Sequence, residues 1–330
     1  MDVQHIATHE AGKDYPRNWN EFLDWFASEE ACEAYLERLR WPLEFGCPAC
    51  NAAQAPYRSS RGRLMCRECG RQSTVTAGTI FDKTRTPLRV WLAAAWYLTN
   101  QKQGVSALGL QRVLGLGSYQ TAWTMLHRFR RAMVRPDGER LKGLVEVDET
   151  YLAITDREAP ISRVGRKGNT SKVLVALAVE MLQPKGFGRI RLRRIENDSD
   201  ECVVPFVQES IEPSAQVRTD GSAAYRSLGK LGYDHQRTVM LGSDVPAHVS
   251  MAGVHRVASL VKRWILGTHH GSVQPAHLDA YLDEFVFRFN RRTSNSRGML
   301  FYRLLQQAVV TEPVTYNNVV KPLSKPAKRG

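Results

Sequence analysis

The chain has 330 residues, and its 46 Lys and Arg against 33 Asp and Glu give a formal net charge of +13. A hydrophobic content of 43% is enough to bury real cores, which excludes a chain that is disordered throughout. The longest unbroken apolar run, residues 90–98, is too short to span a bilayer, and the N-terminus lacks the basic and apolar parts of a secretory signal. We therefore expect a soluble, cytoplasmic, basic protein of two or three domains.

The positive charge is concentrated in two parts of the chain. Residues 85–142 hold ten Lys or Arg against two Asp or Glu, and residues 293–330 hold six against one. Concentrated positive charge favours a polyanionic partner, because contacts to phosphates release condensed counterions. Charge alone does not distinguish a nucleic-acid surface from an ordinary solvated basic face.

The first predicted elements are helices within residues 18–40. Aromatic and aliphatic side chains recur there at helical spacing, and Asn18 and Ser28 can each accept a hydrogen bond from the first turn of a helix. We therefore expect a helical segment at the start of the chain.

Two C-x-x-C motifs follow these helices. The motifs read C-P-A-C and C-R-E-C-G, are separated by 15 residues, and contain Cys47, Cys50, Cys66 and Cys69. Two short turns of this kind offer four thiolates to one tetrahedral zinc ion, so we predict a structural zinc ribbon. A redox C-x-x-C is the alternative, but the second copy of the motif and the glycine after it favour zinc.

The basic segment at 85–140 has the pattern of a helix-turn-helix unit. Helical spacing predicts three helices, over residues 88–102, 106–114 and 118–133. A Gly-Leu-Gly break at 115–117 separates the last two helices, as in units whose final helix contacts DNA. The residues of the final helix that we predict to contact DNA are Arg128, Arg130 and Arg131. An ordinary three-helix bundle with a charged face is the alternative.

After residue 143 the apolar pattern changes to that of an α/β core. Strands rich in Val, Ile and Leu are predicted over residues 144–152, 172–181, 188–195, 216–220 and 235–240. Helices are predicted over residues 201–210, 221–230, 254–266 and 277–291. The first three strands are expected to be joined as hairpins, with a polar loop at 156–171. Three prolines and four basic residues in 312–330 predict a flexible basic tail.

Two aspartates occupy positions typical of an α/β active site. Asp148 lies in the strand V-E-V-D-E-T-Y-L, and Asp220 follows the strand Q-V-R-T and precedes Gly221. Carboxylates at strand ends face the edge at which α/β sites form, and burying one without a partner is costly. Two such carboxylates can share magnesium or manganese ions for phosphoryl transfer. Aspartates that form salt bridges or cap helices are the alternative.

The third part of this pattern is the segment V-H-R-V-A-S-L-V-K-R-W. His255 and Lys262 are seven residues apart, so on a helix they share one face with Ser259 between them. A metal ligand and a cation can then both point at one phosphate site. A lone histidine on a helix is more often a packing residue, and this pair alone does not distinguish the two roles.

The order of these segments resembles the bacterial insertion-sequence transposases of the DDE superfamily, in the branch with an N-terminal zinc ribbon. The resemblance extends from about residue 15 to about residue 310. It rests on the stretches C-P-A-C with C-R-E-C-G, T-A-G-T-I-F-D-K-T-R-T-P-L, V-E-V-D-E-T-Y, R-T-D-G-S-A-A-Y, V-H-R-V-A-S-L-V-K-R-W and Y-L-D-E-F-V-F-R-F-N-R-R. Together these stretches are highly specific, although any one of them alone is not.

The resemblance implies an RNase H-like catalytic core in which Asp148, Asp220 and His255 hold divalent metal ions. Lys262 matches the lysine of this branch, and Lys262 and Arg263 are expected to contact DNA. His255 stands where most of the superfamily has glutamate. The site therefore has one negative charge fewer, which weakens magnesium binding or favours manganese.

Two acidic neighbours of Asp148 are alternative ligands. Along the strand Glu146 shares a face with Asp148, whereas Glu149 points the other way. A further departure from the family pattern follows this motif, because residues 152–154 read L-A-I where the branch often has a pair of glycines. The loop geometry beside the site is therefore open.

By the same resemblance the protein is a DNA transposase. It is expected to bind the terminal inverted repeats of an insertion sequence and to use two magnesium or manganese ions for cleavage and transfer of double-stranded DNA, with zinc as a structural ion. We expect a homodimer or a larger assembly on DNA, associated with the bacterial nucleoid and with no membrane partner. The alternatives are a catalytically inactive DNA-binding regulator or decayed copy, and a nuclease that cuts without joining.

The sequence predicts five consecutive parts. They are an N-terminal helical segment at 1–43, the zinc ribbon at 44–84, the helix-turn-helix segment at 85–140, the RNase H-like catalytic domain at 141–311 and the flexible basic tail at 312–330. The fold class is therefore α/β, with a catalytic core preceded by two smaller DNA-binding or scaffolding modules.

Overall fold

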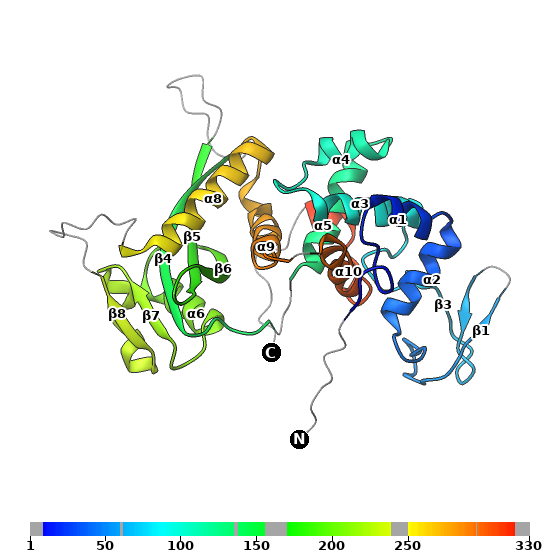
Figure 1. Cartoon of the computed structure of the whole chain (residues 1–330), viewed down its shortest axis with the longest axis horizontal. Helices are drawn as coiled ribbons and strands as arrows, with labels where there is room; N and C mark the ends of the chain where they lie inside the picture. The colour runs from blue at the N-terminus through cyan, green and yellow to red at the C-terminus, as the bar shows by residue number, and fades with distance from the viewer. Residues whose placement is uncertain are drawn as a thin grey trace. The chain divides into compact units, whose positions relative to one another are not determined.

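The computed structural model describes residues 9–59, 62–134, 138–155, 170–238, 250–294 and 296–320. Two compact units make up the chain (Figure 1): Met1–Met133 with Ser294–Gly330, and Val134–Thr293. None of the helices in the described ranges combines the length and the apolar character needed to cross a membrane.

Two short helices begin the first unit. Helix α1 spans Trp19–Trp25 and helix α2 spans Glu29–Arg40. Both of the predicted N-caps are present, because the Asn18 side chain accepts from the Glu21 N–H at 3.1 Å and Ser28 accepts from the Ala31 N–H at 3.2 Å.

A small ribbon follows α2. Strands β1 (Tyr57–Arg58), β2 (Leu64–Met65) and β3 (Gln72–Ser73) pair antiparallel in that order. Its small buried cluster consists of Phe45, Cys47, Leu64 and Cys66. So few apolar residues cannot stabilise a sheet of this size alone, which is why the four cysteines are needed as a metal site.

Three helices come next, as predicted: α3 (Leu88–Asn100), α4 (Ala107–Leu114) and α5 (Tyr119–Ala132). Ser106 and Ser118 cap α4 and α5 by accepting from the backbone N–H groups of Gly109 and Gln120. Helix α4 ends at Gly115, whose φ of 62° lies in the left-handed region that glycine adopts without strain. Helix α4 packs against both α3 and α5, which gives the compact trihelical arrangement of a helix-turn-helix unit.

The C-terminal segment belongs to this first unit, which differs from the predicted boundary at 311. Helix α10 (Arg297–Ala308) packs against α2, α3 and α5. The Phe301 ring is fully buried, with its centroid 5.3 Å from that of Trp96 and 5.8 Å from that of Phe22. Phe301 packs on aromatic rings from much earlier in the chain, so the C-terminal segment completes the core of the first unit.

The predicted flexible tail at 312–330 also differs in its described part. Residues Tyr316–Val320 form helix α11, with Val319 buried and with contacts to α5. The buried Val319 supplies the packing contact that the many polar and proline residues of the tail obscure in the sequence. Residues 321–330 lie outside the described part of the chain.

The second unit contains a five-stranded sheet with the order β6-β5-β4-β7-β8. Strands β4 (Leu144–Thr155), β5 (Thr170–Met181) and β6 (Phe187–Ile195) form an antiparallel meander. Strands β7 (Gln216–Thr219) and β8 (Asp234–Arg237) continue the sheet parallel to β4. This combination of strand order and direction is the RNase H-like arrangement that the sequence predicts.

Helices cover both faces of this sheet (Figure 1). Helices α8 (Ala252–His269) and α9 (Leu278–Phe289), with the short η3 (Pro275–His277), pack on one face, and α6 (Asp200–Ser210) packs on the other. Strand β4 alternates between the two cores: Leu152 and Ile154 face α8 and α9, whereas Val145 and Val147 face α6. Because side chains alternate between the two faces along β4, the position of each acidic residue in the strand decides on which face it lies.

Two predicted segments of this unit differ from the structure. The expected helix at 221–230 consists of two 3-10 turns, η1 (Ala223–Tyr225) and η2 (Leu228–Leu231), because glycines at 221, 229 and 232 disfavour a continuous α-helix. Of the expected loop at 156–171, the last two residues begin β5, and 156–169 lie outside the described residues. The end of the strand expected at 235–240 lies outside them as well.

Candidate metal centres and DNA-contacting residues

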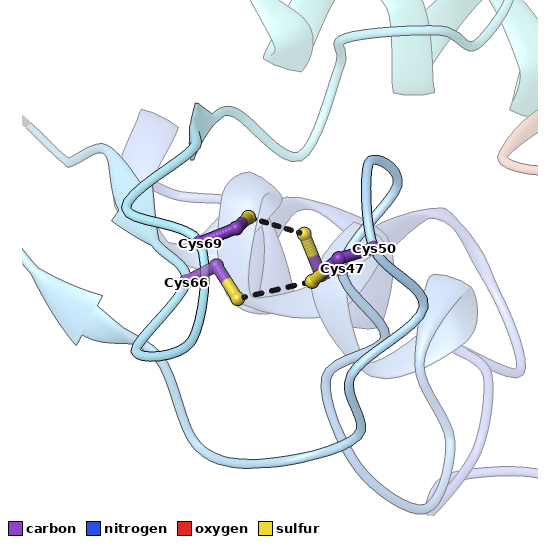
Figure 2. A group of neighbouring side chains, drawn as sticks. All are labelled: Cys47, Cys50, Cys66 and Cys69. Carbon is purple, nitrogen blue, oxygen red and sulfur yellow. Dashed lines mark hydrogen bonds between the residues drawn. The ribbon is translucent and has the colours of Figure 1, made fainter.

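The four cysteines of the ribbon converge from two turns (Figure 2). The Sγ atoms of Cys47 and Cys69 are 3.7 Å apart, as are those of Cys50 and Cys66, and all four Sγ atoms lie within 4.8 Å of one another. A tetrahedral zinc ion with Zn–S bonds of about 2.3 Å requires sulfur atoms about 3.8 Å apart. The cluster therefore has the dimensions of a four-cysteine zinc site.

Each cysteine pair is held by the same backbone turn. The Cys47 N–H donates to Ala52 O at 3.0 Å, and the Cys66 N–H donates to Arg71 O at 2.9 Å. Gly70 completes the second turn with a φ of 71°, which explains the glycine after the second motif. The turns thus place both thiols of each C-x-x-C on the side that faces the other pair.

Backbone N–H groups also favour the thiolate form at this site. The Ala49 N–H points at the Cys47 sulfur at 3.4 Å, and together with the Cys50 N–H it lowers the pKa of Cys47 to about 6. A thiolate is the form that binds zinc, so the turn favours the ligand form of Cys47. The neighbouring thiols raise the pKa of Cys50 to about 12, so its proton is lost only when the ion binds.

The two predicted catalytic aspartates lie on neighbouring strands, Asp148 within β4 and Asp220 directly after the last residue of β7. The β4–β7 register pairs Glu146 with Arg218, so two further residues along both parallel strands bring Asp148 beside Asp220. One oxygen of Asp148 accepts from the Glu149 N–H at 2.8 Å, and one oxygen of Asp220 accepts from the Ser222 N–H at 2.9 Å. These backbone donors orient both carboxylates without consuming their second oxygens.

His255 joins this pair from the first turn of α8. Its Nε2 atom is buried and has no hydrogen-bond partner among the described residues. A buried ring nitrogen without a partner is costly, and a metal ion is one partner that satisfies it. His255 is also close enough to Asp148 to lower the pKa of that carboxyl.

Burial, however, raises the pKa of Asp148 above its ordinary value, and the charge of Asp220 raises it further. Two neighbouring carboxylates repel each other, and a divalent cation bound between them would relieve that repulsion. Two carboxylates and one imidazole are a ligand set that a divalent ion accepts, so the residues present fit the catalytic metal that the resemblance implies.

The two centres differ in how far they are formed. Among the residues that the structure describes, the cysteines are the only group whose three or more ligand atoms all lie within 4.8 Å of one another. The structure brings Asp148, Asp220 and His255 together as electrostatic neighbours, but not within that distance. The four cysteines thus form a site that is ready to bind zinc, whereas Asp148, Asp220 and His255 are near one another without converging to that extent.

The two acidic neighbours of Asp148 have other partners. Glu146 lies on the face of Asp148 and is 1% exposed, and its Oε2 accepts from the Gly253 and Val254 N–H groups at 2.7 and 3.2 Å. Glu149 lies on the opposite face and accepts from the Tyr225 hydroxyl. Burial raises the pKa of Glu149 to about 7. The strand alternation predicted from the sequence therefore agrees with the structure.

The basic residues that follow His255 are accessible. Lys262 and Arg263 are exposed on α8, as is Ser259 between His255 and Lys262. The helix buries Val257, Val261 and other apolar residues against the sheet, so the side that carries Ser259 and Lys262 is accessible from solvent.

The three arginines of α5 have different surroundings, and two of them do not fit the predicted DNA contact. Arg130 is 1% exposed, because it lies on the same face as the buried Met125, Leu126 and Phe129. Arg128 donates to Ile80 O at 2.9 Å and to Asp82 O at 3.3 Å. Arg131 is exposed and keeps the predicted role open.

The start of α5 offers accessible side chains that the predicted DNA-contact residues omit. Tyr119 is 53% exposed and Gln120 is exposed beside it, in the first turn after the Ser118 cap. In helix-turn-helix units the N-terminal part of the final helix is the part that reaches base edges. The glycine break and the serine cap are the sequence signals that mark this turn.

An RNase H-like sheet with two neighbouring aspartates on adjacent strands, in a chain that also carries a four-cysteine ribbon, defines the class of the DDE transposases with a zinc ribbon. Comparison with known families gives the same result. Residues 140–290 match the ISXO2-like transposase domain, and residues 27–72 match the transposase zinc-ribbon domain. Together the two matches span more than half of the chain, and the chain belongs to this family of insertion-sequence transposases.

Individual relatives are more distant. A protein of Halobacterium salinarum named "Uncharacterized protein in transposable element ISH50" is 27% identical over 276 residues, which cover 80% of this chain and 91% of the relative. The Mos1 strand transfer complex is 13% identical with a TM-score of 0.26, covering 72% of this chain and 79% of that one. The Mos1 transposase paired-end complex with the left transposon end is 11% identical, with the same TM-score and coverages of 70% and 77%. The fold assignment rests on the strand order and the family matches, not on these weak structural likenesses.

Proposed function

We propose that this protein is a DNA transposase that binds the terminal inverted repeats of its insertion sequence and cleaves and joins DNA strands with two divalent ions, magnesium or manganese. The observation that carries the proposal is the proximity of Asp148 in β4, Asp220 directly after β7 and His255 in α8, which are electrostatic neighbours. We propose that it acts on double-stranded DNA in the bacterial cytoplasm, at the nucleoid. Because two element ends must be held together for joining, we propose a homodimer or a larger assembly.

In this proposal the side chains divide the task by their chemistry. The carboxylates of Asp148 and Asp220 supply oxygen ligands and negative charge, and His255 supplies a neutral nitrogen. When bound, the divalent ions activate the attacking oxygen and stabilise the leaving oxygen of an in-line displacement. Lys262, two helical turns from His255, holds a DNA phosphate, and Arg263 and Arg131 add exposed positive charge for the backbone.

The zinc ribbon has a structural role in this proposal. Its four ligand positions are filled by cysteines, so a zinc ion bound there has no open position for chemistry. The ribbon and the three-helix segment α3–α5 are the parts that we propose to bind the element ends.

The experiment that tests the proposal is cleavage of labelled DNA that carries the ends of the element. Zinc-loaded wild-type protein should nick those ends in magnesium or manganese, and Asp148→Asn and Asp220→Asn should bind them with unchanged affinity but reduce cleavage by at least about a thousandfold, because each removes a metal ligand. Glu196→Gln, at an exposed carboxylate of the same unit, is the matched control and should cut as the wild type does.

Two other results would overturn the proposal. Specific end binding without cutting in either metal, from folded wild-type protein, would identify a DNA-binding regulator or a decayed copy. Cutting without preference for the element ends, and without joining, would identify a nuclease.

A further inference from the structure

The side chain at the N-cap position of α8 does not cap the helix. Its N-cap position is Met251, whose side chain makes no capping hydrogen bond within the described residues. The first N–H groups of a helix need acceptors, and here the helix begins in a buried place where water is not a substitute. His255 lies in this first turn of α8, so the position of its ring depends on how firmly the turn is held.

The missing acceptor comes from a strand more than 100 residues earlier. The Oε2 atom of Glu146 accepts from the Gly253 N–H at 2.7 Å and from the Val254 N–H at 3.2 Å. Its Oε1 atom lies 3.7 Å from Nη1 of Arg218. One carboxylate thus contacts the three segments that carry the proposed metal ligands: β4 with Asp148, β7 with Asp220 following it, and α8 with His255.

The space between this carboxylate and the backbone of α8 is narrow at Gly253. A Cβ atom added to Gly253 would lie 2.9 Å from Oε2 of Glu146 and 2.6 Å from Sδ of Met181. Glycine at this position is therefore what allows the carboxylate to reach the backbone of the helix. Glu146 itself is 1% exposed and points into this contact.

We propose that Glu146 is a positioning residue of the metal site: it caps α8 across the sheet and thereby fixes His255 as the third ligand, without binding the metal itself. The proposal rests on the proposed function, since it assigns the residue that builds the same site. It also gives Glu146 a structural role in place of the role of alternative metal ligand that the sequence leaves open. Outer residues that orient a ligand typically change metal affinity by about 10- to 100-fold when they are removed.

The test is Mn²⁺ binding to the zinc-loaded full-length protein, followed by electron paramagnetic resonance, with DNA-end cleavage as a second readout. Glu146→Ala should weaken Mn²⁺ binding by about tenfold or more while end binding stays unchanged. Glu146→Gln keeps an oxygen acceptor for the two N–H groups and should restore most of the affinity. If Glu146 were itself a metal ligand, Glu146→Gln would lose as much Mn²⁺ affinity as Glu146→Ala.

A pair of glycine variants tests the same contact with Glu146 intact. Gly253→Ala should weaken Mn²⁺ binding, because the added Cβ pushes the carboxylate from the helix terminus. Gly267→Ala, on the exposed side of the same helix with no atom near the new Cβ, is the matched control and should bind Mn²⁺ as the wild type does.

A double variant then locates the effect. Glu146→Ala in a His255→Ala background should cause no further loss of Mn²⁺ affinity, because the residue that Glu146 positions is already gone. Full additivity, or equal losses for Glu146→Gln and Glu146→Ala, would overturn the positioning role. If the wild type shows no Mn²⁺ binding that is lost on substitution of Asp148, the proposed function itself is contradicted. Failure of the positioning role and failure of the proposed function are therefore distinguishable.

Discussion

Arg130 and Arg131 are adjacent in the sequence and have opposite surroundings: the first is buried in the α5 contact face and the second is exposed. Consecutive residues on a helix point about 100° apart, so one register position separates a core residue from a surface residue. The basic run at the end of α5 is visible in the sequence, but which of its members faces solvent depends on where α4 and α10 pack.

This difference predicts different effects for two otherwise equivalent substitutions. Arg131→Ala should weaken DNA binding by about two- to tenfold and reduce the slope of log affinity against log salt by about one, because one phosphate contact is lost. Arg130→Ala should instead lower the free energy of unfolding by about 1–3 kcal/mol. Salt titrations of binding and denaturant unfolding of both variants check this, and the reverse pattern would contradict the burial assigned to the two residues.

The four cysteines of the ribbon predict a specific response to the loss of one ligand. Cys66→Ser should reduce the zinc content from about one ion per chain to nearly none, because a three-ligand site binds far more weakly and the ribbon has little apolar core of its own. Metal analysis after gel filtration measures this. Cys202→Ser, at a half-buried cysteine of the other unit, should leave the zinc content unchanged, and a zinc content that survives Cys66→Ser would show that the site is not the one described.

At the scale of single elements, α9 contains an acidic residue in an unfavourable place. Burial, with the nearby charge of Asp279, raises the pKa of Asp283 to about 7, whereas an aspartate in the unfolded chain has a pKa near 3.9. The folded protein therefore binds this proton more tightly than the unfolded chain does. Stability should fall as the pH rises from about 4 to about 7, and the loss should be complete above pH 7.

Asp283→Asn removes this penalty. The variant should be more stable than the wild type by about 1–3 kcal/mol at pH 8 and nearly equal to it at pH 4, because one pKa unit corresponds to about 1.4 kcal/mol. Denaturant unfolding at both pH values measures the difference. A variant that is less stable than the wild type at pH 8 would contradict the described burial of the carboxylate.

The elements that the sequence predicts well are those with local signals. The caps of α1, α2, α4 and α5 and both C-x-x-C turns lie where short patterns place them, because each depends on neighbours within a few residues. The side-by-side placement of Asp148 and Asp220 could be expected only in outline, since it depends on the register between β4 and β7. The contact of Glu146 with α8 joins residues more than 100 positions apart, and no local pattern predicts it.

At the scale of the whole molecule, the chain divides differently from its order in sequence. The N-terminal helices, the ribbon, α3–α5 and the C-terminal α10 form one unit, and residues Val134–Thr293 form the other. Helix α10 is amphipathic like any surface helix, so its sequence does not tell with which unit its apolar face packs. The boundary expected at 311 therefore lies near residue 293.

This organisation predicts that a substitution near the C-terminus destabilises the N-terminal unit. Phe301→Ala should lower the stability of that unit by about 3–5 kcal/mol, because the ring is fully buried among Phe22, Phe26 and Trp96. Hydrogen exchange should accelerate in α1–α3 and stay unchanged in β4 and β5. Val310→Ala, at an exposed residue two positions after α10, should change neither, and faster exchange in the sheet instead would contradict the division.

Strand transfer is the reaction that the proposed function requires of Asp148, Asp220 and His255. Element ends with a free 3′-hydroxyl are mixed with supercoiled target plasmid, zinc-loaded protein and magnesium or manganese, so that the cleavage step is bypassed. The wild type should yield covalently joined products and Asp148→Asn none, although the variant should still bind the ends. A folded wild-type protein that binds the ends but yields no joined product in either metal, or joining that survives Asp148→Asn, would contradict the proposed function.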